Sequence, residues 1–195
     1  DVLAEDGFTG LKGKSVGVVV NHTSLGQEGT HLIELLHTAG IRISAVFSPE
    51  HGFAGVADAG EILTDGIEPL TGAPIYSLYG KTRKPTREML NGLDVLIFDM
   101  QDIGVRYYTY VSTLTLTMEA VAEKGIPVIV LDRLNPLGRD MKGPVLDIEF
   151  ASFVGMHPIP IRHGMTIGEL AMMINEEGWL SGGVKVNLTV IQYKG

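Results

Sequence analysis

Four segments of this 195-residue chain carry side chains suited to acid–base chemistry and to the binding of a polar substrate, and each follows an apolar run. Their side chains are carboxylates, imidazoles, amides and guanidinium groups. The segments are Asn21-His22-Thr23, Ser48-Pro49-Glu50-His51-Gly52, Asp99 to Gly104 with Arg106-Tyr107-Tyr108, and Asp132-Arg133-Leu134-Asn135-Pro136. Because short apolar runs bounded by turn residues are typical of buried strands, the pattern predicts that several strands deliver these groups to one site.

Glu50 is the leading candidate for a catalytic acid. It lies between Pro49 and a His51-Gly52 turn. A glutamate at a strand end that faces a cleft can have a raised pKa and act as a general acid. A glutamate that caps or salt-bridges a loop would fit the same position. Asp102 is the second candidate, because it lies further beyond the end of its strand than Asp99. For Asp99, a hydrogen bond to the backbone at the strand end is as plausible as a role in the site.

Several other chemistries lack their sequence motifs. The segment after the first apolar run has no Gly-x-Gly-x-x-Gly pattern, and the chain has neither a phosphate-binding loop nor a Gly-x-Ser-x-Gly nucleophile motif. The absence of cysteine excludes thiol nucleophiles and zinc–thiolate sites. Carboxylate chemistry remains, and we expect no cofactor. A metal-dependent hydrolase that uses His22, His51 and Asp102 is a weaker alternative, because neutral histidines hydrogen-bond a sugar without any metal.

The order of the apolar segments predicts an α/β fold that positions these residues. The expected strands are 15–20, 41–47, 74–79, 94–99, 127–131 and 184–191, and the expected helices are 30–38, 86–91, 110–123 and 166–177. Thr166 and Glu169 have the spacing of a capping box at the start of the last helix. This alternation is typical of a Rossmann-like, doubly wound, mostly parallel sheet with helices on both faces. Ligands bind such sheets beyond the carboxyl ends of the strands.

Composition and charge narrow the possible partners and compartments. Hydrophobic residues make up 45% of the chain, enough for a large core. The formal net charge is −8 and no basic run occurs, so we expect no nucleic-acid partner. No apolar run approaches the roughly 20 residues that span a bilayer. The chain begins without Met and has no visible signal peptide, so we expect an exported, periplasmic or extracellular protein whose signal has been removed.

Five motifs, in this order, resemble those of the exo-β-N-acetylmuramidases, peptidoglycan glycoside hydrolases once described as a domain of unknown function. They are Val19-Val20-Asn21-His22-Thr23, Ser48 to Gly52, Asp99 to Tyr110, Asp132 to Pro136, and Pro160 to Thr166. The resemblance extends from about Gly13 to Gly178. It implies that residues 1–195 form a Rossmann-like catalytic domain, without most or all of a smaller C-terminal domain. It also implies release of β-linked N-acetylmuramic acid from the non-reducing end of peptidoglycan fragments, in cell-wall turnover or recycling.

The resemblance places the family's glutamate at Glu50, in agreement with the choice made from the residues. Glu50 would protonate the glycosidic oxygen, and Asp102 would help a water, act at the anomeric carbon or orient the substrate's acetamide. Arg106 or Arg133 would pair with the lactyl carboxylate of muramic acid. The residues expected to bind a muramic-acid-containing saccharide or muropeptide are Asn21, His22, Thr23, His51, Gln101, Arg106, Tyr107, Tyr108, Arg133, Asn135 and His163. A non-catalytic module that binds peptidoglycan or another sugar is the main alternative.

Three of these assignments have ordinary structural alternatives. Arg106 and Arg133 could each form an internal salt bridge with one of three nearby aspartates, Asp99, Asp102 and Asp132. His163 comes just before the helix expected at 166–177, where the N-terminus favours an anion, and a local contact with the helix start is equally plausible.

Overall fold

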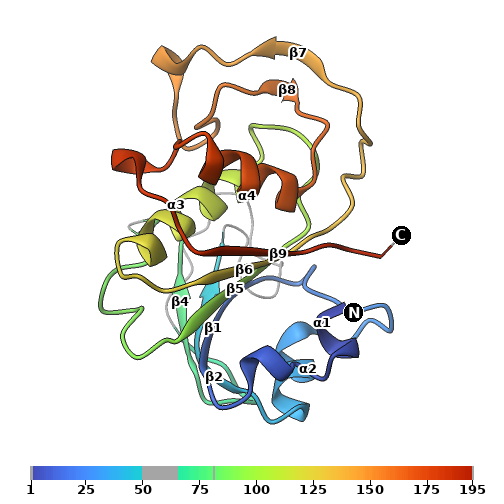
Figure 1. Ribbon diagram of the computed structural model, residues 1–195, viewed down its shortest axis with the longest axis vertical. Coiled ribbons are helices and arrows are strands. Elements are labelled where there is room, and N and C mark those ends of the chain that lie inside the picture. The colour runs from blue at the N-terminus through green and yellow to red at the C-terminus, as the bar shows by residue number, and fades with distance from the viewer. Residues whose placement is uncertain (1, 50–65, 81, 195) are drawn as a thin grey trace.

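The computed structural model describes residues 2–49, 66–80 and 82–194, which fold around a seven-stranded sheet (Figure 1). The strand order is β3-β4-β2-β1-β5-β6-β9, and every neighbouring pair is parallel except β3 with β4. The strands are β1 (Ser15–Val20), β2 (Arg42–Ser48), β3 (Gly66–Ile67), β4 (Pro74–Ser77), β5 (Val95–Asp99), β6 (Val128–Leu131) and β9 (Leu188–Ile191). The predicted α/β fold with a mostly parallel sheet is therefore confirmed.

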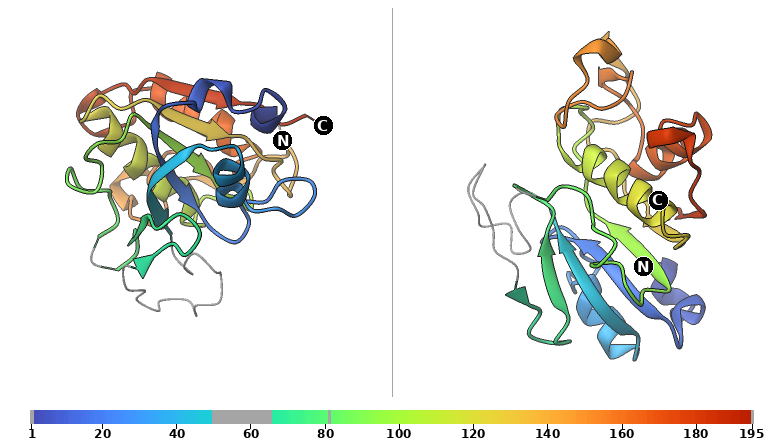
Figure 2. Two further views of the ribbon diagram at one scale, coloured as in Figure 1. Left: turned by 90° about the horizontal axis from the view of Figure 1, so that it is seen from below. Right: turned by 90° about the vertical axis from the view of Figure 1, so that its left-hand side faces the viewer.

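Helices cover both faces of the sheet. Successive side chains of a strand point to opposite faces, so a continuously apolar strand needs burial on both of them. Figure 2 shows α3 (Tyr110–Ala122) and α4 (Ile167–Glu176) on one face and α1 (Val2–Glu5) and α2 (Leu32–Thr38) on the other. In β5, for example, Leu96 and Phe98 belong to the core under α3 and α4, whereas Val95 and Ile97 belong to the core under α1 and α2. Continuous apolar runs are thus explained by burial on both sides.

The last predicted helix, at 166–177, forms as expected and is α4. Thr166 caps α4 by accepting a hydrogen bond from Glu169 N at 3.1 Å, and the Glu169 side chain accepts one from Thr166 N at 2.8 Å. The apolar stripe of α4 is fully buried. At α2, by contrast, the helix begins two residues later than predicted, because the ring of His31, rather than Thr30, caps it through Ile33 N.

One expected helix was wrong, and one expected strand is shorter than predicted. Residues 86–91 form hydrogen-bonded turns rather than a helix, with Leu90 N bonded to Thr86 O, and so short a segment gains too few bonds to offset helix nucleation. The strand expected at 184–191 begins only at Leu188. Ahead of it, the backbone of Val186 pairs with the side-chain amide of Asn175 on α4, which takes both backbone groups away from the sheet.

Residues 132–166 leave the sheet between β6 and α4 and form an excursion that lies above α4 in Figure 1. It contains an antiparallel pair, β7 (Lys142–Val145) and β8 (Pro160–Arg162), that was not predicted. Short 3-10 helices occur here and elsewhere, at Thr9–Leu11, Ile148–Phe150 and Ser181–Gly183. Within the described ranges, no helix has the length and apolarity needed to cross a bilayer.

His157 anchors this excursion to the helical layer. The residue is 4% exposed, its ring stacks on Trp179 with centroids 5.1 Å apart, and Nε2 lies 2.7 Å from Thr115 Oγ1. Burial lowers the pKa of His157 from 6.5 to about 4, against a smaller opposing effect of Glu119. The folded protein therefore holds this imidazole in its neutral form over the mildly acidic range.

We expect the free energy of unfolding to decrease as the pH falls from 6.5 towards 4, because the unfolded chain binds a proton at His157 in this range while the folded chain does not. The stabilisation is complete above pH 6.5, and the loss attributable to this group is about 3 kcal/mol at most. Urea unfolding at several pH values measures it. His157→Gln should flatten the profile, whereas His37→Gln, at an exposed position of α2, should not; equal profiles would contradict the assignment.

Candidate active site

Three of the four polar segments meet at the carboxyl ends of the central strands. The chain passes from β1 to β2 on one side and reaches β5 on the other side of β1, so the strand order reverses between β1 and β5. Val20 pairs with Asp99 across this boundary. In doubly wound sheets, such a reversal opens a crevice at the carboxyl edge, where ligands bind.

The segment after β1 is held by a buried hydrogen-bond network. Asn21 is fully buried; its Nδ2 donates to the Tyr110 hydroxyl at 2.6 Å, and its Oδ1 accepts from the Thr23 hydroxyl at 2.6 Å and Thr23 N at 2.9 Å. The Thr23 oxygen accepts from Gln101 N at 3.0 Å, which ties this segment to the one after β5. His22, in contrast, is exposed. The network gives Asn21 a structural role, and its predicted contact with substrate stays a prediction.

Asp99 and Arg133 form a buried ion pair between the ends of β5 and β6. Arg133 Nε donates to Asp99 Oδ1 at 2.7 Å, and Nη2 donates to Oδ2 at 3.0 Å and to the Leu25 carbonyl at 3.1 Å. The Asp99 side chain is only 3% exposed. Burial raises the pKa of Asp99, and the guanidinium of Arg133 acts in the opposite direction. Arg133 therefore adopts the salt-bridge alternative, which reduces its capacity to bind a substrate carboxylate.

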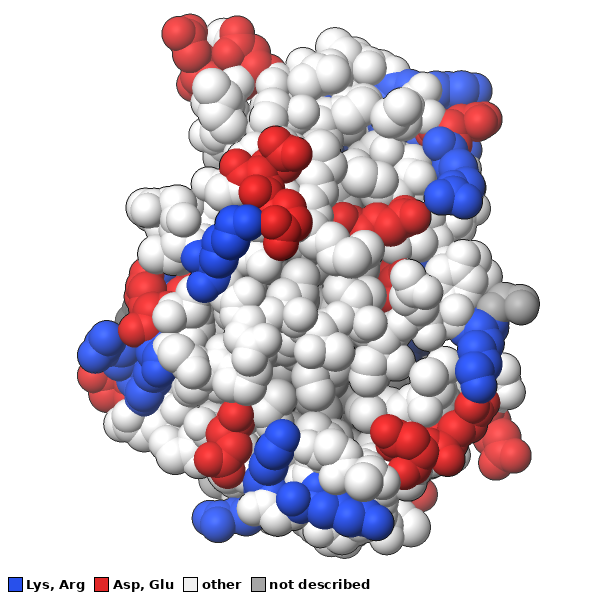
Figure 3. Space-filling model, viewed as in Figure 1, with Lys and Arg blue, Asp and Glu red and all other residues white. Residues whose placement is uncertain are grey.

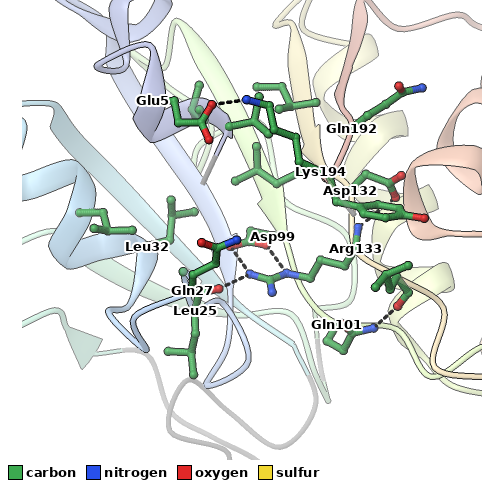
Figure 4. A pocket seen from close by; sticks show the side chains of 18 residues that line it. Glu5, Leu25, Gln27, Leu32, Asp99, Gln101, Asp132, Arg133, Gln192 and Lys194 are labelled. Atoms are coloured by element: carbon green, nitrogen blue, oxygen red, sulfur yellow. Dashed lines mark hydrogen bonds and ion pairs between the residues drawn. The ribbon is translucent and has the colours of Figure 1, made fainter.

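A pocket of about 300 Å³ lies beside this ion pair (Figure 4). Its walls come from α1, α2, the loop before α2, and the chain that follows β5, β6 and β9. Figure 4 shows Lys194 paired with Glu5 on one wall and the Arg133–Asp99 pair on another. Of the predicted site residues that the structure describes, Gln101 and Arg133 line it. The pocket is thus adjacent to the predicted site rather than centred on it.

Gln101 connects the pocket to a second group of predicted residues. Its Nε2 donates to the Asp102 carbonyl at 2.6 Å and to the Leu134 carbonyl at 2.8 Å. Next to it, Asp102 Oδ2 accepts from Gly104 N at 2.7 Å and lies 3.2 Å from His163 Nε2. Asp102, Asn135 and His163, which are far apart in the sequence, are brought together here through contacts with each other's loops.

Arg106 and the two tyrosines that follow it differ in accessibility. Arg106 Nη1 donates to the carbonyls of Pro144 at 2.6 Å and Ile159 at 2.9 Å, and within the described ranges the guanidinium has no carboxylate partner. Tyr107 is 57% exposed, whereas Tyr108 is half-buried and its ring centroid lies 4.5 Å from that of Tyr110. Tyr107 is therefore the better placed of the two to meet a ligand.

Glu50 and His51 lie outside the residues that the structure describes. The last described residue before them is Pro49, buried at the carboxyl end of β2. Ser48 is also buried, and its hydroxyl has no hydrogen-bond partner among the described residues. In residues 2–49, 66–80 and 82–194, no three His, Cys, Asp or Glu side chains gather as a metal site. The metal alternative included His51, so it stays open.

Asp132 has a role that the sequence reasoning missed. Its Oδ1 accepts from Gly168 N at 2.8 Å and its Oδ2 from the Thr166 hydroxyl at 3.0 Å, so this carboxylate is the anion at the N-terminus of α4. A Cβ on Gly168 would lie 2.7 Å from Asp132 Cγ, which explains the glycine. An aspartate directly after a strand, with a Thr-x-Gly sequence at a later helix start, was the available signal.

Charged residues are spread over the face of the molecule that Figure 3 shows. Figure 3 shows lysine and arginine side chains interspersed with acidic ones around the rim and an uncharged area across the centre.

The chain matches known proteins over nearly its whole length. Residues 16–195 match the family model described as exo-beta-N-acetylmuramidase NamZ, N-terminal. The chain is 46% identical over 196 residues to the peptidoglycan beta-N-acetylmuramidase NamZ of Bacillus subtilis, covering 100% of this chain and 46% of that protein. Two crystal structures of DUF1343 family proteins from Bacteroides fragilis are similar, with TM-scores of 0.88 and 0.84 and identities of 45% and 40%.

Those structures are matched over 97% and 96% of this chain and over 47% and 49% of theirs. The chain therefore spans about half the length of the relatives it matches.

Replacing Arg133 by Met should lower the free energy of unfolding by about 3 kcal/mol, because it leaves the Asp99 carboxylate buried without its partner. Urea denaturation followed by circular dichroism measures the change. Arg139→Met is the matched control: Arg139 pairs with Glu169 at 3.3 Å but its side chain is 89% exposed, so we expect less than about 1 kcal/mol. Equal losses in the two variants would show that the Asp99 pair does not stabilise the site.

Proposed function

The chain belongs to the NamZ exo-β-N-acetylmuramidase family, of which it matches the N-terminal part, and we propose from this that it hydrolyses the bond holding a non-reducing-end, β-linked N-acetylmuramic acid in peptidoglycan fragments. The observation that carries the proposal is the 46% identity to a named peptidoglycan β-N-acetylmuramidase over this entire chain. The polar crevice at the carboxyl edge of the sheet supports it, because this is where such folds bind ligands. The substrate is accordingly a muramic-acid-containing saccharide or muropeptide.

We assign the general acid to Glu50, which follows Pro49, the buried residue directly after β2. Glu50 would donate its proton to the glycosidic oxygen as the bond to the anomeric carbon breaks. Asp102 is the proposed second group, and it would activate water, attack the anomeric carbon or orient the acetamide of the substrate. A separation of roughly 5–5.5 Å between the two carboxyl groups would favour retention of configuration, and one of roughly 6.5–9.5 Å would favour inversion.

Arg106 is the better candidate for the lactyl carboxylate that distinguishes muramic acid from N-acetylglucosamine. The charge of Arg133 is neutralised by Asp99 through two hydrogen bonds. Arg106 contacts only carbonyl oxygens among the described residues, so its positive charge remains available to an anion. A guanidinium binds a carboxylate through two parallel hydrogen bonds, which adds both affinity and orientation.

Exposed groups near Arg106 and β1 would contact the sugar itself. The ring of Tyr107 offers an apolar face of the kind that packs against a sugar ring, and the exposed His22 can hydrogen-bond a hydroxyl. Gln101 uses its Nε2 for two carbonyls, so its Oε1 is the atom left to accept a hydrogen bond.

The substrate also indicates where the protein would act. Peptidoglycan lies outside the cytoplasmic membrane, so we place the protein in the periplasm or outside the cell, in cell-wall turnover or recycling. A chain without cysteine is compatible with an oxidising compartment. Fractionation of producing cells tests the assignment, which fails if the protein occurs only in the cytoplasm.

The decisive assay is release of N-acetylmuramic acid from a chromogenic β-muramide, with the matching N-acetylglucosaminide in parallel. We expect the wild-type protein to hydrolyse the muramide and not the N-acetylglucosaminide. Glu50→Gln should reduce the rate by about 100-fold or more, because the amide cannot donate the proton. Glu34→Gln, the same change at an exposed position of α2, should leave the rate unchanged.

The outcomes separate the alternatives. A folded wild-type protein that binds muramyl ligands without turnover would contradict the proposal and indicate a binding module. Repeating the assay with a chain extended to the length of the relatives distinguishes that result from a requirement for their second half. Turnover that a chelator abolishes and added metal restores would indicate the alternative of a metal-dependent hydrolase.

Arg106→Gln should raise KM for the muramide by about ten-fold or more, with a smaller change in kcat, because it removes a charge-assisted contact with the bound ground state. Inhibition by free N-acetylmuramic acid should weaken, and inhibition by N-acetylglucosamine should not. Arg42→Gln, at the start of β2 and thus at the opposite edge of the sheet, is the control. Melting temperatures show whether the protein still folds without the bonds from Arg106 to the Pro144 and Ile159 carbonyls. Undiminished discrimination between the two sugars would rule out this role.

A further inference from the structure

Asp102 is enclosed by a closed ring of contacts between three loops. Its Oδ2 accepts from Gly104 N at 2.7 Å and lies 3.2 Å from His163 Nε2. His163 Nδ1 accepts from Met165 N at 3.3 Å, and the Met165 carbonyl accepts from Asn135 Nδ2 at 2.9 Å. Asn135 packs so closely on Gly104 that a Cβ there would collide with its amide, which closes the ring.

The ring determines which nitrogen of His163 carries the proton. A neutral imidazole has one donor and one acceptor nitrogen. Because Nδ1 accepts the backbone N–H of Met165, the proton lies on Nε2, the atom that faces Asp102. The two atoms are at ion-pair distance, and their geometry is not that of a hydrogen bond.

His163 is more deeply enclosed than Asp102. Its exposed fraction is 0%, against 5% for Asp102. The anion at the N-terminus of the neighbouring helix α4 is Asp132 of the chain itself, so His163 has no bound anion to recognise there. Among the described candidate catalytic residues, its neighbour is Asp102.

The ring leaves one oxygen of Asp102 free. Oδ1 is buried and has no hydrogen-bond partner among the described residues. An unpaired buried acceptor costs roughly 1–3 kcal/mol, which favours a donor that arrives with the substrate or with a water. Oδ2, in contrast, accepts a hydrogen bond from Gly104 N and lies at ion-pair distance from His163 Nε2.

We propose that His163 is a positioning residue: its Nε2–H holds Asp102 Oδ2 so that Oδ1 remains free for the reacting water or for the substrate's acetamide, and Asn135 maintains the arrangement through the Met165 loop. This inference rests on the proposed function, in which Asp102 is the second catalytic group. It replaces the expected substrate contacts of His163 and Asn135 with an action through Asp102.

Kinetics with the muramide test this role in three variants. His163→Phe should lower kcat by about ten-fold or more and change KM by less than about two-fold, because a displaced catalytic group affects the reaction more than binding. His163→Gln keeps an N–H donor near the position of Nε2 and should recover the rate to within about three-fold of wild type. In an Asp102→Asn background, His163→Phe should have no further effect. Melting temperatures identify any variant that fails to fold.

Long-range ¹H–¹⁵N spectra of the imidazoles provide a readout that does not need turnover. We expect one resonance pair, absent in His163→Gln, from a neutral ring protonated at Nε2, and its Nε2 signal should shift in Asp102→Asn. If the wild-type protein hydrolyses no muramide, the proposed function fails and these spectra alone decide the positioning role.

Several results would overturn the inference. In the spectra, they are a His163 proton on Nδ1 or an Nε2 signal that does not respond to Asp102→Asn. In the kinetics, they are a rise in KM without loss of kcat in His163→Phe, or a folded His163→Gln variant that is as slow as His163→Phe. A change in KM would show that His163 contacts the substrate.

Discussion

Parallel pairing of β1 with β5 is the constraint on which the candidate site depends. The ladder aligns Val20 with Asp99, so the segments that follow the two strands start side by side. The hydrogen bond from Gln101 N to the Thr23 hydroxyl continues that pairing beyond the sheet. Since the neighbouring strands β2 and β6 run in the same direction, their carboxyl ends reach the same edge.

Two carboxylates that are three residues apart in the sequence have different environments at this edge. Asp99 faces a guanidinium that occupies both of its oxygens, which makes it an internal counter-ion. Asp102 faces the His163 imidazole and one backbone N–H, and among the described residues only one of its oxygens has these neighbours. The first arrangement stabilises the junction of β5 with β6, and the second leaves an acceptor for chemistry.

The excursion at 132–166 contributes to the site although it lies off the sheet. Asp132 begins it by capping α4, and His163 ends it against Asp102. The Arg106 guanidinium bonds the Pro144 carbonyl in β7, and its backbone N bonds the Ile161 carbonyl in β8, so the segment after β5 is attached to this antiparallel pair as well as to the sheet. The Asp102 carboxylate thereby contacts a residue more than 60 positions away in the sequence.

The sequence alone determined the α/β fold, because strands buried on both faces are continuously apolar and α4 carries its capping box in four residues. It also determined which segments supply polar groups, since those groups follow directly on the strands. Only the tertiary structure decided how each group is used: Arg133 pairs with Asp99, Asn21 is fully buried, and His163 faces Asp102. The reason is that the apolar pattern of a strand can be read from residues adjacent in the sequence. The partner of a buried polar group depends instead on which distant loop the fold places beside it with a matching donor or acceptor.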